Sequence, residues 1–340
     1  MNGKNHKSCC RQSCFYRFNK FCCAGTYFCC KSNLTPCSYK NFIDSNCIRT
    51  NFQRVTSKIQ KEVDFFEPFM DALRSLGHTF AEKIHGRHIV EFDGNNTGKQ
   101  DCRCELADIA ILCYSNEQKT LRLTFNQVKL AKHSFSLVEP PFFFLANKKQ
   151  WQLLSGRYKF SPYQNRKTFN GDILKDALLP SIGSFGVFYK DDLHCYEFKY
   201  FIADLLTPEP TLKSCLLSFN GKIGRVRSNK TGFQEIEGTS NLDCFFCALK
   251  SGLIGSPIME LLGNSGFYNS LMDAIEECKN VTNDLPSNIT DRKNANIEII
   301  DEVTKLIEFL RSEVTDKIGF ESYDDSKKFS IRNMVILCLD

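Results

Sequence analysis

The hydrophobic and polar positions of the chain follow two periods that predict alternating helices and strands. Between residues 56 and 76, Val63, Phe66, Met70 and Leu73 recur at spacings of three and four, which predicts an amphipathic helix. Pro68 interrupts this pattern and predicts either a kink or a second helix with the proline in its first turn. Short apolar runs predict strands at 80–84, 88–92, 105–112, 121–130 and 181–189. Further helices are predicted at 146–156, 241–252, 267–278 and 297–311.

The polar stretch 115–120 separates the apolar runs 105–112 and 121–130, which predicts an antiparallel hairpin. Side chains alternate along a strand, so Gln127 and Lys129 share one face. A paired strand can bring Asp108 to that face. A carboxylate, an amide oxygen and an ammonium group would then converge, and this set is suited to holding a divalent cation and a water beside a phosphate.

Composition narrows the class of protein. With 340 residues, of which 42% are hydrophobic and 24% charged, the chain is predicted to be globular. The net charge of +5 permits a polyanionic partner without requiring one. No apolar run approaches the roughly 18 residues of a membrane helix, and the N-terminus lacks the apolar core of a secretory signal. We therefore expect a cytoplasmic protein without a membrane partner.

The cysteines mark off the N-terminal segment. Nine of the 18 lie between Cys9 and Cys47, but none of these nine forms the CxxC pair that is typical of structural zinc sites. The segment is therefore interpreted as a poorly ordered extension, and a zinc module stays open. The predicted organisation is an extension at 1–52, an α/β core at 53–165 and a mixed α/β region at 166–340 that completes or flanks the core.

The predicted site assigns a role to each residue. Asp108 would bind Mg²⁺ or Mn²⁺ as a charged ligand, while the Gln127 amide oxygen and the Val128 backbone carbonyl would add neutral ligands. Lys129 would orient a metal-bound water or stabilise the phosphorus centre. A further carboxylate is expected from the preceding helix, with Glu67 the first choice and Glu62 the second.

These residues resemble the PD-(D/E)XK nuclease superfamily, which has the restriction-endonuclease-like fold. The order is an acid-bearing helix, a strand, Asp108 and a strand with Gln127 and Lys129; this QxK form is similar to Mrr-like enzymes. Residues 102–108 are similar to uncharacterised bacterial members, and Glu105 would match a neighbouring acid. The resemblance covers about residues 60–160. The sequence departs from the commonest pattern at Ala107, in place of proline, and at Gln127, in place of an acid.

The resemblance implies an α/β fold, with a mixed central sheet flanked by helices, and a mixed α/β C-terminal extension. It also implies a metal-dependent DNA endonuclease, in phage defence or DNA processing. Two alternatives stay open: a catalytically inactive nuclease-like module that binds nucleic acid or another partner, and a zinc- or redox-responsive protein built on the cysteine-rich N-terminus. The oligomeric state also stays open, a dimer included.

Other motifs favour ordinary structural roles. The histidines of 85–88 and 191–195 are more typical of surface positions. The cysteine pairs of 102–104 and 244–247 are more typical of packing than of metal or redox chemistry. Basic residues cluster at 148–150, 157–160, 164–168 and 221–230, where phosphate contact and a solvated face are equally compatible with the pattern.

Overall fold

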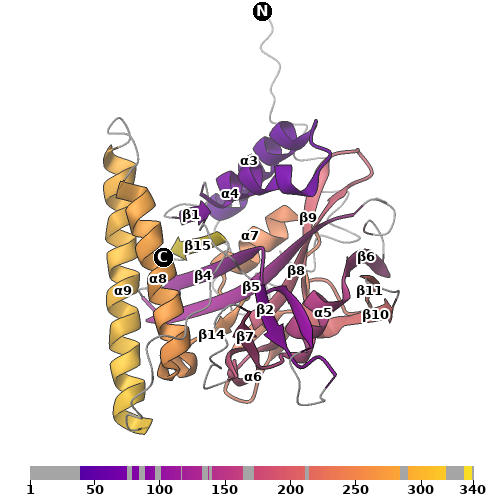
Figure 1. Cartoon of the computed structure of the whole chain (residues 1–340). Coiled ribbons are helices and arrows are strands. Elements are labelled where there is room, and N and C mark those ends of the chain that lie inside the picture. Colours follow the sequence, from indigo (N-terminus) through magenta and orange to yellow (C-terminus); the bar gives the residue numbers. More distant parts are fainter. Residues whose placement is uncertain are drawn as a thin grey trace, which may run out of the picture.

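A computed structural model describes residues 39–74, 79–83, 89–95, 101–115, 117–131, 137, 140–163, 172–210, 214–283, 290–318 and 333–338. Figure 1 shows a central sheet with helices on both sides. The strand order in this main sheet is β1-β15-β4-β5-β8-β9, and the short strand β14 also pairs with β5. The strands are β1 (Thr79–Lys83), β4 (Ile109–Ser115), β5 (Thr120–Leu130), β8 (Gly183–Lys190), β9 (Tyr196–Ile202), β14 (Ser256–Pro257) and β15 (Asn333–Cys338).

The sheet is mixed. β4 and β5 form the antiparallel pair that the hairpin pattern predicted. β8 runs parallel to β5, and helix α5 (Lys148–Gly156) lies between these two strands in sequence. β15 runs parallel to β4. Every residue of β4 is buried, which is the expected consequence of covering both faces of its sheet.

Two apolar cores lie on opposite faces of the main sheet. One core packs under α3 (Tyr39–Thr56), α4 (Phe66–Arg74) and α7 (Leu242–Lys250). The other packs under α5, α8 (Ser265–Asn283) and α9 (Thr290–Ile318). In Figure 1, α8 and α9 run side by side along the left of the molecule. The mixed α/β class is confirmed.

Three smaller sheets surround this core. One has the order β10-β11-β6, one is β3-β2-β7, and the third is the pair β12-β13. Their bounds are β2 (Ile89–Phe92), β3 (Cys102–Glu105), β6 (Phe142–Asn147), β7 (Phe160–Pro162), β10 (Leu206–Pro210), β11 (Ser214–Phe219), β12 (Val226–Ser228) and β13 (Gln234–Ile236). The short helices are η2 (Glu62–Phe65), α6 (Ile173–Asp176), η4 (Pro180–Ile182), η5 (Ala203–Leu205) and η6 (Met259–Gly263).

Pro68 decides how the segment 56–76 folds. α3 ends at Thr56, η2 follows, and α4 begins at Phe66, so Pro68 lies in the first turn of α4. A first-turn proline loses no helical hydrogen bond, because that N–H has no partner within the helix. The second of the two predicted outcomes is therefore confirmed. The predicted strand at 105–112 also divides in two, since β3 ends at Glu105 and β4 begins at Ile109.

Helix α3 extends the folded core into the predicted N-terminal extension. Ile48 and Phe52 are buried, and the Phe52 ring stacks on Phe188 of β8 with 5.8 Å between centroids. The composition change near residue 52 therefore does not mark the edge of the packed structure. Residues 1–38, with the cysteines from Cys9 to Cys37, lie outside the described residues.

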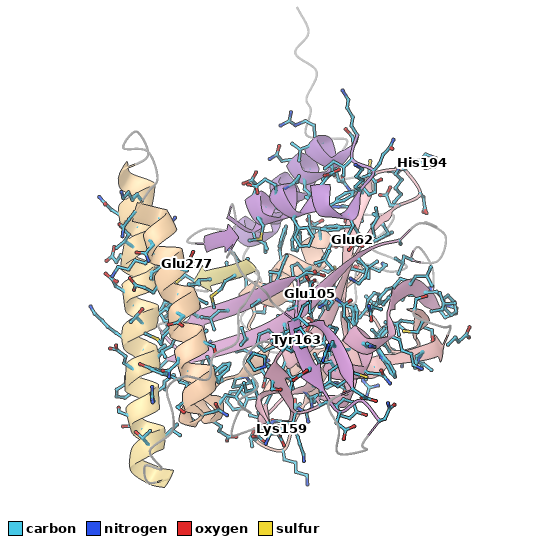
Figure 2. All side chains as sticks on the ribbon, viewed as in Figure 1. Glu62, Glu105, Lys159, Tyr163, His194 and Glu277 are labelled. Atoms are coloured by element: carbon cyan, nitrogen blue, oxygen red, sulfur yellow. The ribbon has the colours of Figure 1, made fainter. Side chains whose placement is uncertain are left out.

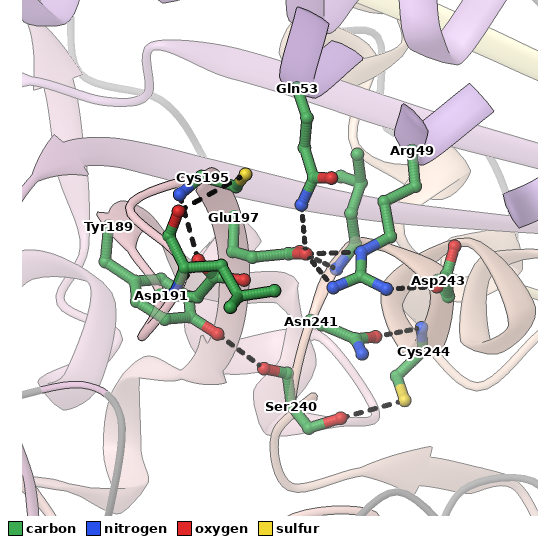
Figure 3. Close-up of polar contacts among 12 residues, drawn as sticks. Arg49, Gln53, Tyr189, Asp191, Cys195, Glu197, Ser240, Asn241, Asp243 and Cys244 are labelled. Atoms are coloured by element: carbon green, nitrogen blue, oxygen red, sulfur yellow. Dashed lines mark hydrogen bonds and ion pairs between the residues drawn. The ribbon is translucent and has the colours of Figure 1, made fainter. Parts of the chain in front are cut away.

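A buried ion pair fixes α3 to the edge strand β9 (Figure 3). The Arg49 guanidinium contacts the Glu197 carboxylate and lies 3.4 Å from Asp243 Oδ2. Gln53 Nε2 donates to Glu197 Oε1 at 2.6 Å, and the Leu242 N–H donates to Oε2 at 3.2 Å. Burial raises the pKa of Glu197, and the nearby Arg49 charge opposes that shift. The carboxylate thus joins α3, β9 and α7.

The helices within the described ranges include none with the length and apolar character that a membrane crossing needs.

Candidate active site

The candidate site lies where β4 begins and β5 extends past it. The last pair in the ladder is Ile109 with Asn126, and the Asp108 N–H still donates to the Asn126 carbonyl at 3.0 Å. Beyond this pair, two carboxylates accept hydrogen bonds from backbone N–H groups of β5. Asp108 Oδ2 accepts from the Val128 N–H at 2.8 Å, and Glu62 Oε2 accepts from the Leu130 N–H at 3.0 Å. Both acids are thereby held against the same strand end.

Lys129 lies between these two acids. Its Nζ atom is 3.7 Å from Asp108 Oδ2 and 3.9 Å from Glu62 Oε1. Asp108 is buried, Lys129 is half-buried and Glu62 is the most exposed of the three. The attraction between Lys129 and Asp108 is therefore less screened than that of a surface ion pair. The structure brings Asp108 and Lys129 together, as the sequence pattern predicted.

Gln127 is fully buried beside this group, with 0% of its surface exposed. Its Nε2 donates to the Glu105 carbonyl at 3.2 Å, whereas its Oε1 has no hydrogen-bond partner. Leaving such an acceptor unpaired costs roughly 1–3 kcal/mol, so an orphaned amide oxygen marks a place suited to a ligand. The Val128 carbonyl is also directed toward Asp108, because the N–H and C=O of one strand residue point to the same side.

The acid from the helical segment is Glu62, the second choice of the sequence analysis. Glu62 lies in η2 and contacts both Leu130 and Lys129. Glu67, the first choice, lies in the first turn of α4 and is exposed. The reason is local: the chain breaks between α3 and α4, and η2 rather than α4 meets the end of β5. Sequence periodicity placed both acids on one continuous segment, so the ranking of Glu67 above Glu62 took no account of where η2 meets β5.

The remaining sequence candidates have structural partners or fall outside the site. Asp191 Oδ1 accepts from the N–H groups of Leu193 and Cys195, both at 2.9 Å, and so shapes the turn between β8 and β9. Burial raises the pKa of Cys104 to about 12, which favours the thiol over a metal-binding thiolate. Cys244 and Cys247 are half-buried on α7. The histidines of 85–88 lie outside the described residues.

Two arginines of the basic segment 221–230 form ion pairs with acidic side chains of the protein. Arg227 Nη2 donates to Glu235 Oε1 at 2.8 Å and lies 3.9 Å from Asp204. Arg225 Nε lies 3.4 Å from Glu237. These pairs join the β12–β13 region to the buried acids Glu235 and Glu237 and to Asp204 of η5. Among the other basic clusters, 164–168 lies outside the described residues.

Within the described ranges, no group of three or more histidine, cysteine, aspartate or glutamate residues is arranged to hold a metal ion. The oxygen atoms at the start of β4 are instead of mixed type: two carboxylates, an amide and a backbone carbonyl.

Comparison of the chain with protein-family models, curated proteins and solved structures gave no match. The function is therefore argued from the chemistry of this site.

Proposed function

We propose that this protein is a metal-dependent nuclease that hydrolyses phosphodiester bonds in DNA. The observation that carries the proposal is the convergence of Asp108, Glu62 and Lys129 at the start of β4, beside the unpaired Gln127 Oε1. We infer a restriction-endonuclease-like core, and a cytoplasmic role in phage defence or DNA processing.

The available atoms favour a hard divalent cation. Asp108, Gln127 Oε1 and the Val128 carbonyl are oxygen donors, and Mg²⁺ and Mn²⁺ prefer oxygen ligands. Glu62 would add a second carboxylate, which matters because Gln127 is neutral. When bound, such a cation activates a water and stabilises the charge that develops on the phosphate.

Lys129 would act on the phosphate or the attacking water. Asp108 and Glu62 attract its ammonium group from two directions, which restricts a long side chain to one region. An ammonium group that is held in place before the substrate binds stabilises developing negative charge without a cost of reorganisation. The chain's own contribution would therefore be positioning and charge: the two acids would hold a metal cation, and Lys129 would lie beside the reacting group.

The order of elements supports the assignment to PD-(D/E)XK proteins. An acid-bearing helical segment comes first, Asp108 stands at the start of β4, β5 carries Gln127 and Lys129, and α5 follows. This is the order on which the resemblance of the sequence rests.

Cleavage assays on plasmid DNA and oligonucleotides test this proposal. With Mg²⁺ or Mn²⁺, we expect Asp108→Asn and Lys129→Ala to abolish cleavage. Glu62→Gln should reduce cleavage about 10- to 100-fold, the range typical of groups that support a metal site. Glu67→Gln is the matched control, since it makes the same change five residues away on an exposed helix position, and it should cleave as the unaltered protein does. Cleavage that survives both Asp108→Asn and Lys129→Ala would refute the proposal.

A second candidate is a nuclease-like module that binds nucleic acid without cutting it. It is favoured by the bonds that Asp108 and Glu62 make to the backbone of β5, because these give both acids a structural task. Binding that weakens steeply with salt, in a protein that never cleaves with either metal, would support this candidate instead.

A further inference from the structure

The small sheet β3-β2-β7 leads directly out of the candidate site. Glu105, the last residue of β3, accepts the hydrogen bond of Gln127 and pairs with Ile89 of β2. The Tyr163 N–H donates to the Ile89 carbonyl at 3.0 Å. Figure 2 shows Glu62, Glu105 and Tyr163 following one another down the middle of the view. The sheet thus adjoins the site at Glu105.

The outer face of this sheet carries an exposed pair of a guanidinium and an aromatic ring, the Arg103–Tyr163 stack. Ile89 is 40% exposed, Tyr163 is 37% exposed and the Arg103 side chain is 54% exposed. The Arg103 guanidinium lies over the Tyr163 ring, with 3.9 Å between Cζ and the ring centroid. Arg103 Nε is also 3.4 Å from Glu91 Oε2, which directs the guanidinium across β2. The opposite face of the sheet is buried, with Val90, Phe92, Cys102, Cys104 and Phe160 in the core.

The chemistry of this face fits nucleobases better than a phosphate backbone. Within the described strands β2, β3 and β7, Arg103 is the one cationic residue, and Glu91 and Glu105 accompany it, so these strands do not form a basic surface of the kind that duplex phosphates require. A phenol ring and a guanidinium plane are instead the groups on which unpaired bases stack. The stack is already formed, so little conformational entropy is lost when a base is added to it.

We propose that the Arg103–Tyr163 stack binds unpaired bases, so that the site acts on single-stranded nucleic acid or on unpaired regions of a duplex. This inference rests on the proposed function, because it assigns the form of the substrate for the same site. In an intact duplex the faces of the bases are covered by their neighbours, so only an unpaired strand can use the stack. DNA and RNA share this chemistry, and the assay tells them apart.

Binding without catalysis tests the inference. Fluorescently labelled single-stranded and duplex oligonucleotides, as DNA and as RNA, are titrated with the Asp108→Asn protein in the presence of a chelator. Stacking on one aromatic ring is worth about 1–3 kcal/mol per base. Tyr163→Ala should therefore weaken single-strand binding about 5- to 150-fold. Tyr163→Phe should retain binding, because it keeps the ring, and Arg103→Ala should weaken it. Duplex binding should change less than about twofold in all three variants, because a paired duplex offers no base face to the ring.

The chain offers a matched control elsewhere. Arg311 of α9 lies over the Tyr268 ring of α8 at 3.6 Å, so Tyr268→Ala removes an equivalent pair far from β3 in sequence. It should leave single-strand binding unchanged. The inference is overturned if Tyr163→Ala behaves like Tyr268→Ala, or if it weakens duplex binding as much as single-strand binding. Cleavage assays separate the two proposals. If Tyr163→Ala leaves single-strand binding unchanged while the unaltered protein cleaves DNA, only the proposed base stacking is refuted. If Tyr163→Ala weakens single-strand binding but the unaltered protein cleaves nothing, only the proposed nuclease activity is refuted.

Discussion

Asp108 has two different tasks at one oxygen. Its Oδ2 atom accepts the Val128 N–H, and the same atom is the one nearest Lys129. The backbone bond fixes the carboxylate, so its position does not depend on the flexible lysine. Replacing it with alanine would remove both contacts, whereas Asp108→Asn keeps an acceptor for the strand and removes the charge. For this reason the asparagine variant separates chemistry from folding.

The buried position of Gln127 makes it sensitive to an added negative charge. The change Gln127→Glu places a carboxylate at a fully buried position, where an uncompensated charge is destabilising. If the surrounding oxygens hold a divalent cation, that cation compensates the new charge and binds more tightly. We expect Gln127→Glu to unfold at a lower temperature than the unaltered protein without metal, and to gain more stability from Mg²⁺. Thermal unfolding with and without Mg²⁺ measures both effects.

Gln150→Glu is the control for this change, because Gln150 is also buried but belongs to α5. It should lose stability without recovering it in Mg²⁺. Equal responses of both variants to Mg²⁺ would contradict a metal site at Gln127.

The sequence predicted the arrangement of site residues only where neighbours along one strand determine it. Gln127 and Lys129 share a face because side chains alternate along any strand. The choice between Glu62 and Glu67 was not predictable, since it depends on which turn of the helical segment meets the end of β5. The orphaned oxygen of Gln127 likewise follows from packing against Glu105, which no spacing reveals.

At the scale of elements, α3 depends on the buried pair between Arg49 and Glu197. Removing one partner of a buried pair leaves an uncompensated charge, which costs about 3–5 kcal/mol. We therefore expect Arg49→Met to lower the free energy of unfolding by about that amount. The double variant Arg49→Met/Glu197→Gln should regain part of the lost free energy of unfolding, because the uncompensated Glu197 charge is removed. Urea unfolding of the single and double variants measures this coupling, and purely additive effects would show that the pair is not coupled.

Element types were more predictable than their limits. The helices α5, α7, α8 and α9 and the strands β5 and β8 lie where periodicity indicated them. The split of 105–112 into β3 and β4 was missed, because residues 106–112 form one apolar run interrupted by Asp108 alone and the bend at 106–108 contains no glycine or proline. That bend is what separates Asp108 from the strand and turns it toward β5.

At the scale of the whole molecule, the main sheet is assembled from distant segments. β15 lies between β1 and β4, so a strand from the C-terminal end occupies an interior place in the sheet. Met334, Val335, Ile336 and Leu337 are all fully buried there. The predicted regions 53–165 and 166–340 therefore contribute strands to one sheet.

Ile336 tests this arrangement. Ile336→Ala removes a fully buried side chain, and such a change costs about 2–5 kcal/mol. Leu145→Ala is the control, because Leu145 lies on β6 with 53% of its surface exposed, and it should change stability by less than about 0.5 kcal/mol. Chemical denaturation of both variants provides the comparison. A small effect at Ile336 would show that β15 is not part of the cooperative core.

The sequence by itself determined the α/β class, the β4–β5 hairpin and the common face of Gln127 and Lys129, because periodicity and turn composition are local properties of the chain. Only the tertiary structure decided that Glu62 joins the site, that β15 enters the middle of the sheet and that Arg103 lies over Tyr163. Each of these depends on contacts between residues far apart in the sequence, and such contacts are set by packing of the whole chain rather than by any local pattern.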